Sequence, residues 1–369
     1  MAYLENITSL CWNISTNLTI AEEQRERLTY GPLDVFLITS FMPTILAIGL
    51  VGNLAFLLVV FRVPWMRTVT NRYLTNLAVA DITFLISSVS HSLWQFYGSN
   101  GIYNEVFLGV AGCVTLPTLS DIAHLASISF VTLVSIERYY AVCKPHAHSQ
   151  STVRQHNLLL IVTSWLGAVI IALVLNIPSR KNLSSFCVIW PDEENVANLP
   201  RAFGYCGPVQ DTPWVIKAVN FFQTVPYFTS FVVNACIYAL VIHTLHRTNI
   251  GKHLTTSTKS SHTTKRNRIT AMLLINGSVF FLCLIPFELV SIYAIIADAE
   301  DIPNRSHLRT WVDLCRITVY INSVINPFLY NAINPRYRLA FFKAFGIVCK
   351  TQTPNTTLMT HLNVNTINN

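Results

Sequence analysis

Charged side chains are scarce in this chain of 369 residues. Asp, Glu, Lys and Arg make up 12% of it, whereas a soluble domain usually has roughly 25%. At the same time 52% of the residues are hydrophobic and the mean hydropathy is +0.44. This composition excludes an ordinary soluble protein and indicates a chain that lies mostly in lipid.

Sequence patterns of catalysis and transport are also missing. The chain has no HExxH, no GxSxG and no glycine-rich phosphate-binding loop. Its two halves do not resemble each other, as those of many transporters do. We therefore expect neither an enzyme nor a transporter, and the sequence indicates no cofactor and no metal apart from a sodium ion considered below.

Seven long apolar runs are present instead, each long enough to cross a bilayer as a helix. They lie at residues 33–61, 70–97, 110–143, 155–178, 214–246, 267–296 and 307–331. None alternates like a barrel strand, and backbone groups in lipid must be hydrogen-bonded within their own segment, so helices are required. We predict an all-α fold, a seven-transmembrane helix bundle at residues 33–331.

The segments outside the bundle have distinct compositions. Residues 1–32 form a polar tail, and residues 332–349 alternate cations with aromatic side chains at helical spacing. The latter pattern predicts a short amphipathic helix on the membrane surface. Residues 350–369 are polar and rich in Thr, which is typical of a disordered tail that can be phosphorylated.

The basic residues gather in alternate loops and after the seventh run, whereas acidic residues gather in the others. The positive-inside rule then places the N-terminus outside the cell and the C-terminus in the cytoplasm. Three glycosylation sequons in the tail, at Asn6, Asn13 and Asn17, agree with this orientation. No cleavable signal peptide is expected. The net charge of +7 belongs to the cytoplasmic face and does not indicate nucleic-acid binding.

Polar residues inside predicted membrane helices are costly and are therefore functional candidates. Asp81 lies in the second helix, and its plausible partners in the first and seventh are Asn53, Asn322, Ser323 and Asn326. These residues could form a polar network that only fixes helix packing, or a functional network that holds a sodium ion and rearranges. The two interpretations are compatible.

Prolines inside three predicted helices each remove a backbone hydrogen bond. Pro327 follows Asn326 and precedes Tyr330 by one turn, which indicates a hinge close to the inner face. Pro226 and Pro286 predict similar weak points in the fifth and sixth helices.

Cysteines are expected to form a disulfide at the outer face. Cys113 begins the third helix, and the following long outer loop carries Cys187 and Cys206. The sequence does not decide the partner. We favour Cys187, since Cys206 could pair with Cys11 of the tail or stay free. Cys349 could carry a palmitoyl group or remain a thiol.

The order and spacing of these features resemble the rhodopsin-like (class A) G-protein-coupled receptors over residues 33–349. The matching motifs run through the bundle: Gly52-Asn53, Leu77 to Asp81, Cys113, Glu137-Arg138-Tyr139, Trp165, Pro226, Phe280-x-x-Cys283-x-x-Pro286 and Asn326-Pro327-x-x-Tyr330. The resemblance implies that Glu137 holds Arg138 at rest and releases it to a G protein when the sixth helix swings outward. It assigns activation roles to Tyr139, Phe280, Pro286, Asn326, Pro327 and Tyr330.

Three departures from the family pattern bear on that switch. The inner end of the sixth helix carries Lys265 and Arg266 where many members have an acid, so we expect the latch to rest on Glu137 and on polar Thr or Ser neighbours. Leu284 replaces an aromatic residue after Cys283. Asn234 stands where a tyrosine is usual, and Tyr238 follows one turn later.

The ligand is expected to bind between helices three, five, six and seven. Monoamine receptors of the family have an aspartate seven residues after the cysteine that begins helix three; here that position is Ser120, and Asp121 is its neighbour. The candidate set is Asp121, His124, Gln223, Glu288, Arg316 and Tyr320. Two acids and an arginine suit a peptide, although Glu288 and Arg316 could simply pair with each other.

Within the family the chain looks closest to the thyrotropin-releasing hormone receptors and their neuropeptide-receptor relatives. Arg316 and Tyr320 match the seventh-helix pattern of those receptors, whereas Glu288 replaces an arginine and Asp121 a tyrosine. The resemblance implies a plasma-membrane receptor for a different, more basic neuropeptide, with Gq-class G proteins, arrestin and membrane lipid as partners. The alternative is a receptor for a monoamine, lipid or other small ligand. A light-sensing opsin is excluded because no lysine lies between Lys265 and Lys343.

Overall fold

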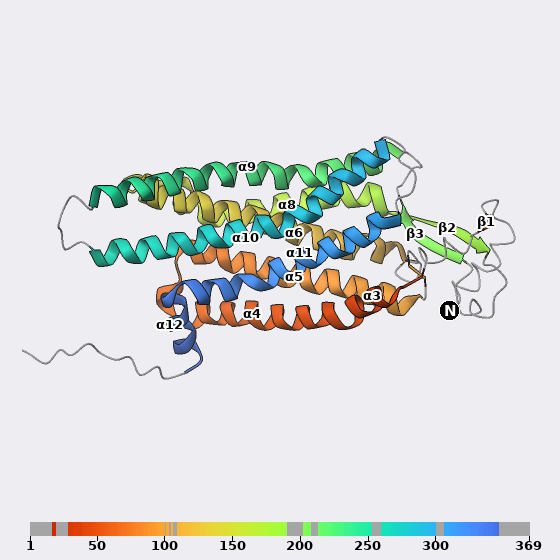
Figure 1. The fold of residues 1–369 in the computed structure, drawn as a ribbon, viewed down its shortest axis with the longest axis horizontal. Coiled ribbons are helices and arrows are strands. Elements are labelled where there is room, and N and C mark those ends of the chain that lie inside the picture. The colour runs from red at the N-terminus through yellow and green to blue at the C-terminus, as the bar shows by residue number, and fades with distance from the viewer. Residues whose placement is uncertain are drawn as a thin grey trace, which may run out of the picture.

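The computed structural model describes residues 17–19, 29–99, 101–102, 105, 109–189, 202–207, 213–252, 260–299 and 306–346. Seven long helical segments run side by side along the long axis (Figure 1). Within the described residues these are α3–η1–α4 (Pro32–Phe36, Leu37–Phe41, Met42–Arg62), α5 (Val69–Gly98), α6 (Gly109–Cys143), α8 (Asn157–Arg180), α9 (Pro213–Lys252), α10 (Ser260–Ala299) and α11 (Ser306–Ile333). The predicted bundle is thereby confirmed.

Short elements connect these helices. η2 (Pro64–Met66) joins α4 to α5, while η4 (His148–Gln150) and α7 (Thr152–Gln155) join α6 to α8. After α11 the chain turns into α12 (Pro335–Ala344), which lies across one end of the bundle (Figure 1). We call this the α12 end.

Six of the seven segments, among the residues described, are long and apolar enough to cross a membrane. The exception is α11, whose bounds nevertheless agree with the predicted run at 307–331. Its low hydropathy follows from the polar residues that it turns into the bundle, among them the buried Asn322, Ser323 and Asn326. These side chains face the interior of the bundle rather than lipid, and Asn326 donates a hydrogen bond to Asp81 there, so the helix need not be apolar all round.

Close packing between α4, α5 and α11 depends on one glycine. A Cβ at Gly49 would lie 2.3 Å from Leu85 Cδ1 and 3.0 Å from Val324 Cγ2. Only a residue without a side chain allows the three helices to approach this closely. On the α12 side of this contact, the main buried cluster joins the helices through side chains such as Tyr73, Phe130 and Phe280.

A small sheet caps the opposite end, which we call the sheet end. β1 (Asn17–Thr19) pairs parallel with β2 (Asn182–Ile189), and β2 pairs antiparallel with β3 (Ala202–Gly207). The sheet was not predicted from the sequence. Its strands are short and lie in polar outer segments, where the apolar alternation that signals a strand is weak.

The disulfide joins Cys113, at the start of α6, to Cys206 in β3, with the Cα atoms 5.7 Å apart. The predicted pairing with Cys187 is therefore wrong. In the β2–β3 register, Cys187 lies opposite Ala202 and Cys206 lies opposite Leu183, so the two loop cysteines are at different ends of the hairpin, and Cys206 is the one that is bonded to α6.

A carboxylate that sequence reasoning missed supports this disulfide. Glu105 accepts hydrogen bonds from the backbone N–H of Cys206, at 2.9 Å, and from Gln95 Nε2, at 2.7 Å. Its own backbone N–H donates to the Gly204 carbonyl. Glu105 thus fastens β3 to α5. No motif marks it, because an acid in an outer loop is ordinary.

α12 begins with a side-chain cap and is anchored by one tyrosine. The Asn334 side chain accepts from the Arg336 N–H at 3.0 Å, and Pro335 occupies the first helical position. The Tyr337 hydroxyl donates to Asn71 Oδ1 of α5. Burial raises the pKa of Tyr337 well above its ordinary value near 10, so this donor keeps its proton throughout the physiological pH range.

Candidate functional site

A buried carboxylate organises the α12 end of α6. Glu137 is 3% exposed and accepts from Arg138 Nε at 2.5 Å and from Thr70 Oγ1 of α5 at 3.1 Å. Arg138 Nη2 also bonds Glu137, and it lies 2.6 Å from Thr70 Oγ1. The arginine is therefore held by an acid and a threonine, which agrees with a latch that needs no acid on the sixth helix.

A histidine that sequence reasoning missed completes this group. His148 in η4 lies with Nε2 3.2 Å from Glu137 Oε1, on the carboxylate oxygen that Arg138 does not use. Arg154 of α7 approaches the other ring nitrogen at 3.3 Å. The loop after α6 is thereby joined to the latch. Eleven histidines occur in the chain, and nothing in the sequence distinguishes this one.

The two residues that depart from the usual tyrosine pattern both have partners on α6. Asn234 of α9 is fully buried and donates to Thr132 Oγ1 at 3.0 Å. Ser135 donates to the Tyr238 hydroxyl at 3.0 Å. That hydroxyl also lies against α10, because a Cβ at Gly277 would come within 1.7 Å of it. Tyr238 thus fills the junction of three helices.

The predicted polar core is assembled where α4, α5 and α11 meet. Asn326 Nδ2 donates to Asp81 Oδ2 at 2.8 Å, and Asn53 Nδ2 donates to the Ser323 carbonyl at 2.9 Å. All five predicted members are buried. Four oxygens have no hydrogen-bond partner: Asp81 Oδ1, Asn53 Oδ1, Asn322 Oδ1 and Asn326 Oδ1.

The predicted hinge residues lie inside helices, with Pro226 in α9, Pro286 in α10 and Pro327 in α11. Tyr330, one turn after Pro327, is 1% exposed and packs against the rings of Phe56 and Tyr337, with centroids 5.2 and 5.7 Å away. Other activation candidates differ in burial: Phe280 and Leu284 are buried, whereas Tyr139 is half-buried.

Four of the six ligand candidates form two pairs centred on α6. Asp121 accepts from Gln223 Nε2 of α9 at 3.2 Å and also from Asn176 Nδ2 of α8 at 2.7 Å. One turn further along, His124 Nε2 lies 3.8 Å from Glu288 Oε1 of α10. Asn176 was not a candidate, since an amide in an apolar helix gives no specific signal.

The remaining two candidates lie on α11. Arg316 is exposed, and Tyr320 is buried with its ring 5.7 Å from that of Phe84. The ion pair considered between Glu288 and Arg316 does not occur among the described residues, where Glu288 meets His124 instead. The structure therefore brings together candidates from α6, α9 and α10. The two candidates on α11 do not take part in these two pairs.

Some predicted sites lie outside the described residues. These are the sequon asparagines Asn6 and Asn13 and the palmitoylation candidate Cys349. Asn17 lies in β1, where it is the register partner of Cys187. Glu105, Cys113 and Cys206 each place one potential metal-ligand atom within 4.8 Å of the others. Both sulfur atoms are used in the disulfide, so this group does not offer thiolate ligands.

Comparisons with known proteins agree with this arrangement. Residues 52–330 match the family model described as 7 transmembrane receptor (rhodopsin family). Neuromedin-U receptor 2 of Mus musculus is 26% identical over 310 residues, covering 83% of this chain and 74% of the relative. The human (Homo sapiens) thyrotropin-releasing hormone receptor is 25% identical over 325 residues, covering 81% and 75%. The human neuropeptides B/W receptor type 2 is 26% identical over 325 residues, covering 84% and 86%.

Proposed function

Because the chain belongs to the rhodopsin family of seven-transmembrane receptors, we propose that it is a receptor for an extracellular neuropeptide that activates heterotrimeric G proteins. The protein is a multi-pass plasma membrane receptor and not an enzyme. The relatives named above are receptors for peptides by their names, which supports a ligand of the same class.

Asp121 carries the proposal on the ligand. Its carboxylate is hydrogen-bonded by two amides. Arg180 and His124 act on it electrostatically, but no cation of the described residues forms an ion pair with it. A carboxylate inside a bundle is costly unless its charge is compensated. A cationic group of a peptide would supply a counter-charge in direct contact. Glu288 of α10 offers a second anchor for such a ligand. Its carboxylate lies 3.8 Å from His124, which follows Asp121 by one turn of α6.

The distribution of charge supports the orientation. The described segments at the α12 end include Arg62, Arg67, Arg72, Arg154, Arg336 and Arg338. Under the positive-inside rule that end faces the cytoplasm. We infer that the peptide enters at the sheet end, near β2 and β3, and that the G protein meets Arg138. Coupling to the Gq class and binding of arrestin are part of the same proposal.

The polar core is proposed to hold a sodium ion. Hard cations prefer oxygen ligands, and the unpartnered oxygens of Asp81, Asn53, Asn322 and Asn326 belong to buried residues of α4, α5 and α11. The donor set therefore fits the ion. Asp81 would supply its negative charge, and the amide oxygens would complete its shell. Such an ion would stabilise the arrangement of α4, α5 and α11.

A ligand screen tests the proposed function. Cells that express the chain are challenged with a neuropeptide library and, in parallel, with monoamines and lipids, and calcium and cAMP are recorded. We expect a response to a basic peptide whose potency falls about tenfold or more in Asp121→Asn, as expected for a lost charge-assisted contact worth 1.5–3 kcal/mol. The response of Arg316→Ala is recorded in the same assays, and an unchanged response would remove Arg316 from the candidate set.

The control is Asp34→Asn, which changes an acid that caps α3 and lies outside the candidate set. A response to monoamines alone would overturn the peptide assignment. An equal loss of potency in Asp34→Asn would show that Asp121 has no specific part in recognition.

A further inference from the structure

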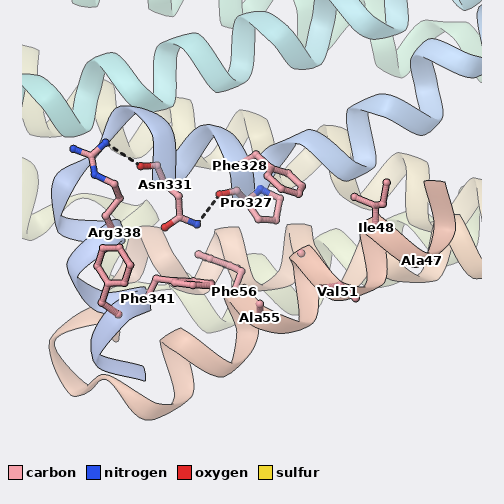
Figure 2. Close-up of a pocket in the computed structure, with 12 residues that line it drawn as sticks. Ala47, Ile48, Val51, Ala55, Phe56, Pro327, Phe328, Asn331, Arg338 and Phe341 are labelled. Atoms are coloured by element: carbon pink, nitrogen blue, oxygen red, sulfur yellow. Dashed lines mark hydrogen bonds between the residues drawn. The ribbon is translucent and has the colours of Figure 1, made fainter. Parts of the chain in front are cut away.

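An apolar groove lies on the outside of the bundle, away from the ligand candidates. It has a volume of about 620 Å³ and is formed by α4, α11 and α12 (Figure 2). Its walls are the small and aliphatic side chains of α4, such as Ala47, Ile48 and Val51, and the rings of Phe328, Phe341 and Phe342. Gly52 and Ala55 keep its floor open.

The position of the groove is that of a lipid-facing surface. Val51 and Phe328 are 71% and 51% exposed, so no other helix of the described chain covers them. Gly52 is half-buried, and a Cβ at this position would lie 3.4 Å from the ring of Phe328 and 3.7 Å from Pro327 Cγ. The depression is therefore built by small residues of α4 facing large rings of α11 and α12. In a bilayer, an acyl chain has to fill such a space.

One charged residue closes the groove at the α12 end. Arg338 Nη1 donates to the Asn331 carbonyl at 3.4 Å (Figure 2) and to the Ala332 carbonyl at 3.0 Å. Its other N–H groups have no partner among the described residues, and the side chain is exposed. Arg338 thus presents guanidinium N–H donors at the end of the apolar groove.

The charge around this end of the groove has a single sign. Residues 42–62 and 327–346 contain no acid, whereas Arg62, Arg336, Arg338 and Lys343 belong to them. Arg336 is engaged with Trp65, its guanidinium 4.9 Å from the ring, and Arg62 donates to the Ala344 carbonyl. Arg338 is the cation that lines the groove itself.

We propose that the groove binds an anionic phospholipid of the cytoplasmic leaflet, with one acyl chain between α4 and α11 and its phosphate on Arg338. An apolar groove alone would accept any lipid. Guanidinium groups bind phosphate through paired N–H donors, and basic pockets beside membrane helices on the cytoplasmic side select anionic headgroups. The inference rests on the proposed orientation and is independent of the ligand's identity.

Lipid selectivity of the purified receptor tests this directly and needs no agonist. The full chain is reconstituted in phosphatidylcholine nanodiscs that contain a trace of spin-labelled phosphatidylserine or, separately, spin-labelled phosphatidylcholine. Electron paramagnetic resonance then measures the motionally restricted fraction of each probe. We expect the serine lipid to be enriched severalfold in the wild type. Arg338→Gln should abolish the enrichment, and Arg338→Lys should retain part of it.

Two matched pairs separate the groove from the general surface. Arg67→Gln removes a charge at the same end, where the guanidinium lies over Phe61 outside the groove, and it should keep the enrichment. Ala47→Phe fills the groove and should reduce the restricted fraction of the serine lipid, whereas Val162→Phe on exposed α8 should not. Thermal unfolding of each variant shows that it is folded.

Several outcomes would overturn the proposal. These are equal restriction of both probes by the wild type, enrichment that survives Arg338→Gln, and enrichment that falls equally in Arg67→Gln. Displacement of the probe by cholesterol with no effect of Arg338 would assign the groove to a sterol. A restricted fraction that falls as the receptor is concentrated would assign it to a second copy of the chain.

Discussion

At the scale of single residues, the latch shows how a buried charge is kept satisfied. The Glu137 carboxylate is contacted by three polar side chains: Arg138 of α6, Thr70 of α5 and His148 of η4. Each carboxylate oxygen has at least one donor. These hydrogen bonds and the ion pair with Arg138 compensate the cost of burying the carboxylate, so the resting position of Arg138 depends on this one side chain.

Glu137→Gln should therefore raise basal signalling. The amide keeps the shape but loses the charge that holds Arg138, so the equilibrium moves toward the state in which the arginine is released. Nucleotide exchange on the G protein without agonist is the measurement, and a severalfold rise is expected. Thr70→Val should give a smaller rise, and Asp34→Asn none. A basal level in Glu137→Gln equal to that of the wild type would disprove the latch.

At the scale of elements, pairs of helices meet through residues that leave little freedom. α9 and α10 are joined where Tyr238 crosses Gly277, and the same hydroxyl receives a hydrogen bond from α6. α4, α5 and α11 are joined by Gly49 and by the amides around Asp81. These two junctions are built by different residues and can be tested separately.

Gly277→Ala should force α9 and α10 apart. The added Cβ would lie 1.7 Å from the Tyr238 hydroxyl and 2.9 Å from its Cζ, so the ring has to move and its bond with Ser135 is lost. Overpacking of this kind costs about 1–3 kcal/mol. Thermal unfolding in detergent should show a lower midpoint, and Tyr238→Ala in the same chain should recover part of it.

The matched control for this change is Gly167→Ala on α8, where an added Cβ meets nothing within 4 Å. It should leave the midpoint unchanged. If both alanine variants unfold at the same temperature as the wild type, the close contact of Tyr238 with α10 is not a feature of the folded receptor.

Sodium should stabilise the junction of α4, α5 and α11. A ligand that binds only the folded state at ten times its Kd adds about 1.4 kcal/mol. The unfolding midpoint of the purified receptor should thus rise when potassium chloride is replaced by sodium chloride at constant ionic strength. Asp81→Asn should remove this rise, whereas Asp34→Asn should keep it. A sodium effect that persists in Asp81→Asn would exclude this site.

At the scale of the whole molecule, a disulfide among the described residues ties the sheet end to α6. The Cys113–Cys206 disulfide spans a sequence separation of 93 residues, and Glu105 reinforces it from the loop before α6. Closing so long a loop restricts the unfolded chain strongly, and removal of such bonds typically costs 2–5 kcal/mol. The outer loop is therefore held over the bundle before any ligand binds.

Replacement of the two cysteines should reveal this pairing. Cys113→Ser and Cys206→Ser should each lower surface expression and thermal stability, and the double variant should be no worse than either single one, because both remove the same bond. Cys187 is not part of this bond, so any effect of Cys187→Ser should add to that of Cys113→Ser. Additivity between Cys113 and Cys206 would contradict the observed bond.

Much of the architecture could be predicted from the sequence because membranes constrain it strongly. Apolar runs predicted most helix bounds within three residues, although α9 extends beyond the predicted run to Lys252 and α10 begins before it at Ser260. Motifs such as Glu137-Arg138-Tyr139 have fixed places on those helices. Contacts made by common residues could not be predicted. His148, Glu105 and Asn176 act through positions set by loop and bundle packing, and the partner of Cys113 depends on a hairpin register that no local pattern encodes.

The small sheet also has a consequence for the tail. β1 pairs with β2, and Thr29 pairs with Gly101, so two points of the tail that lie close together in the sequence are both held at the sheet end. A strand of three residues pairs weakly by itself, but a second attachment close by in the chain keeps its effective concentration in the millimolar range. Truncation beyond Thr19 would uncover the edge of β2 and leave it open to pairing with another chain.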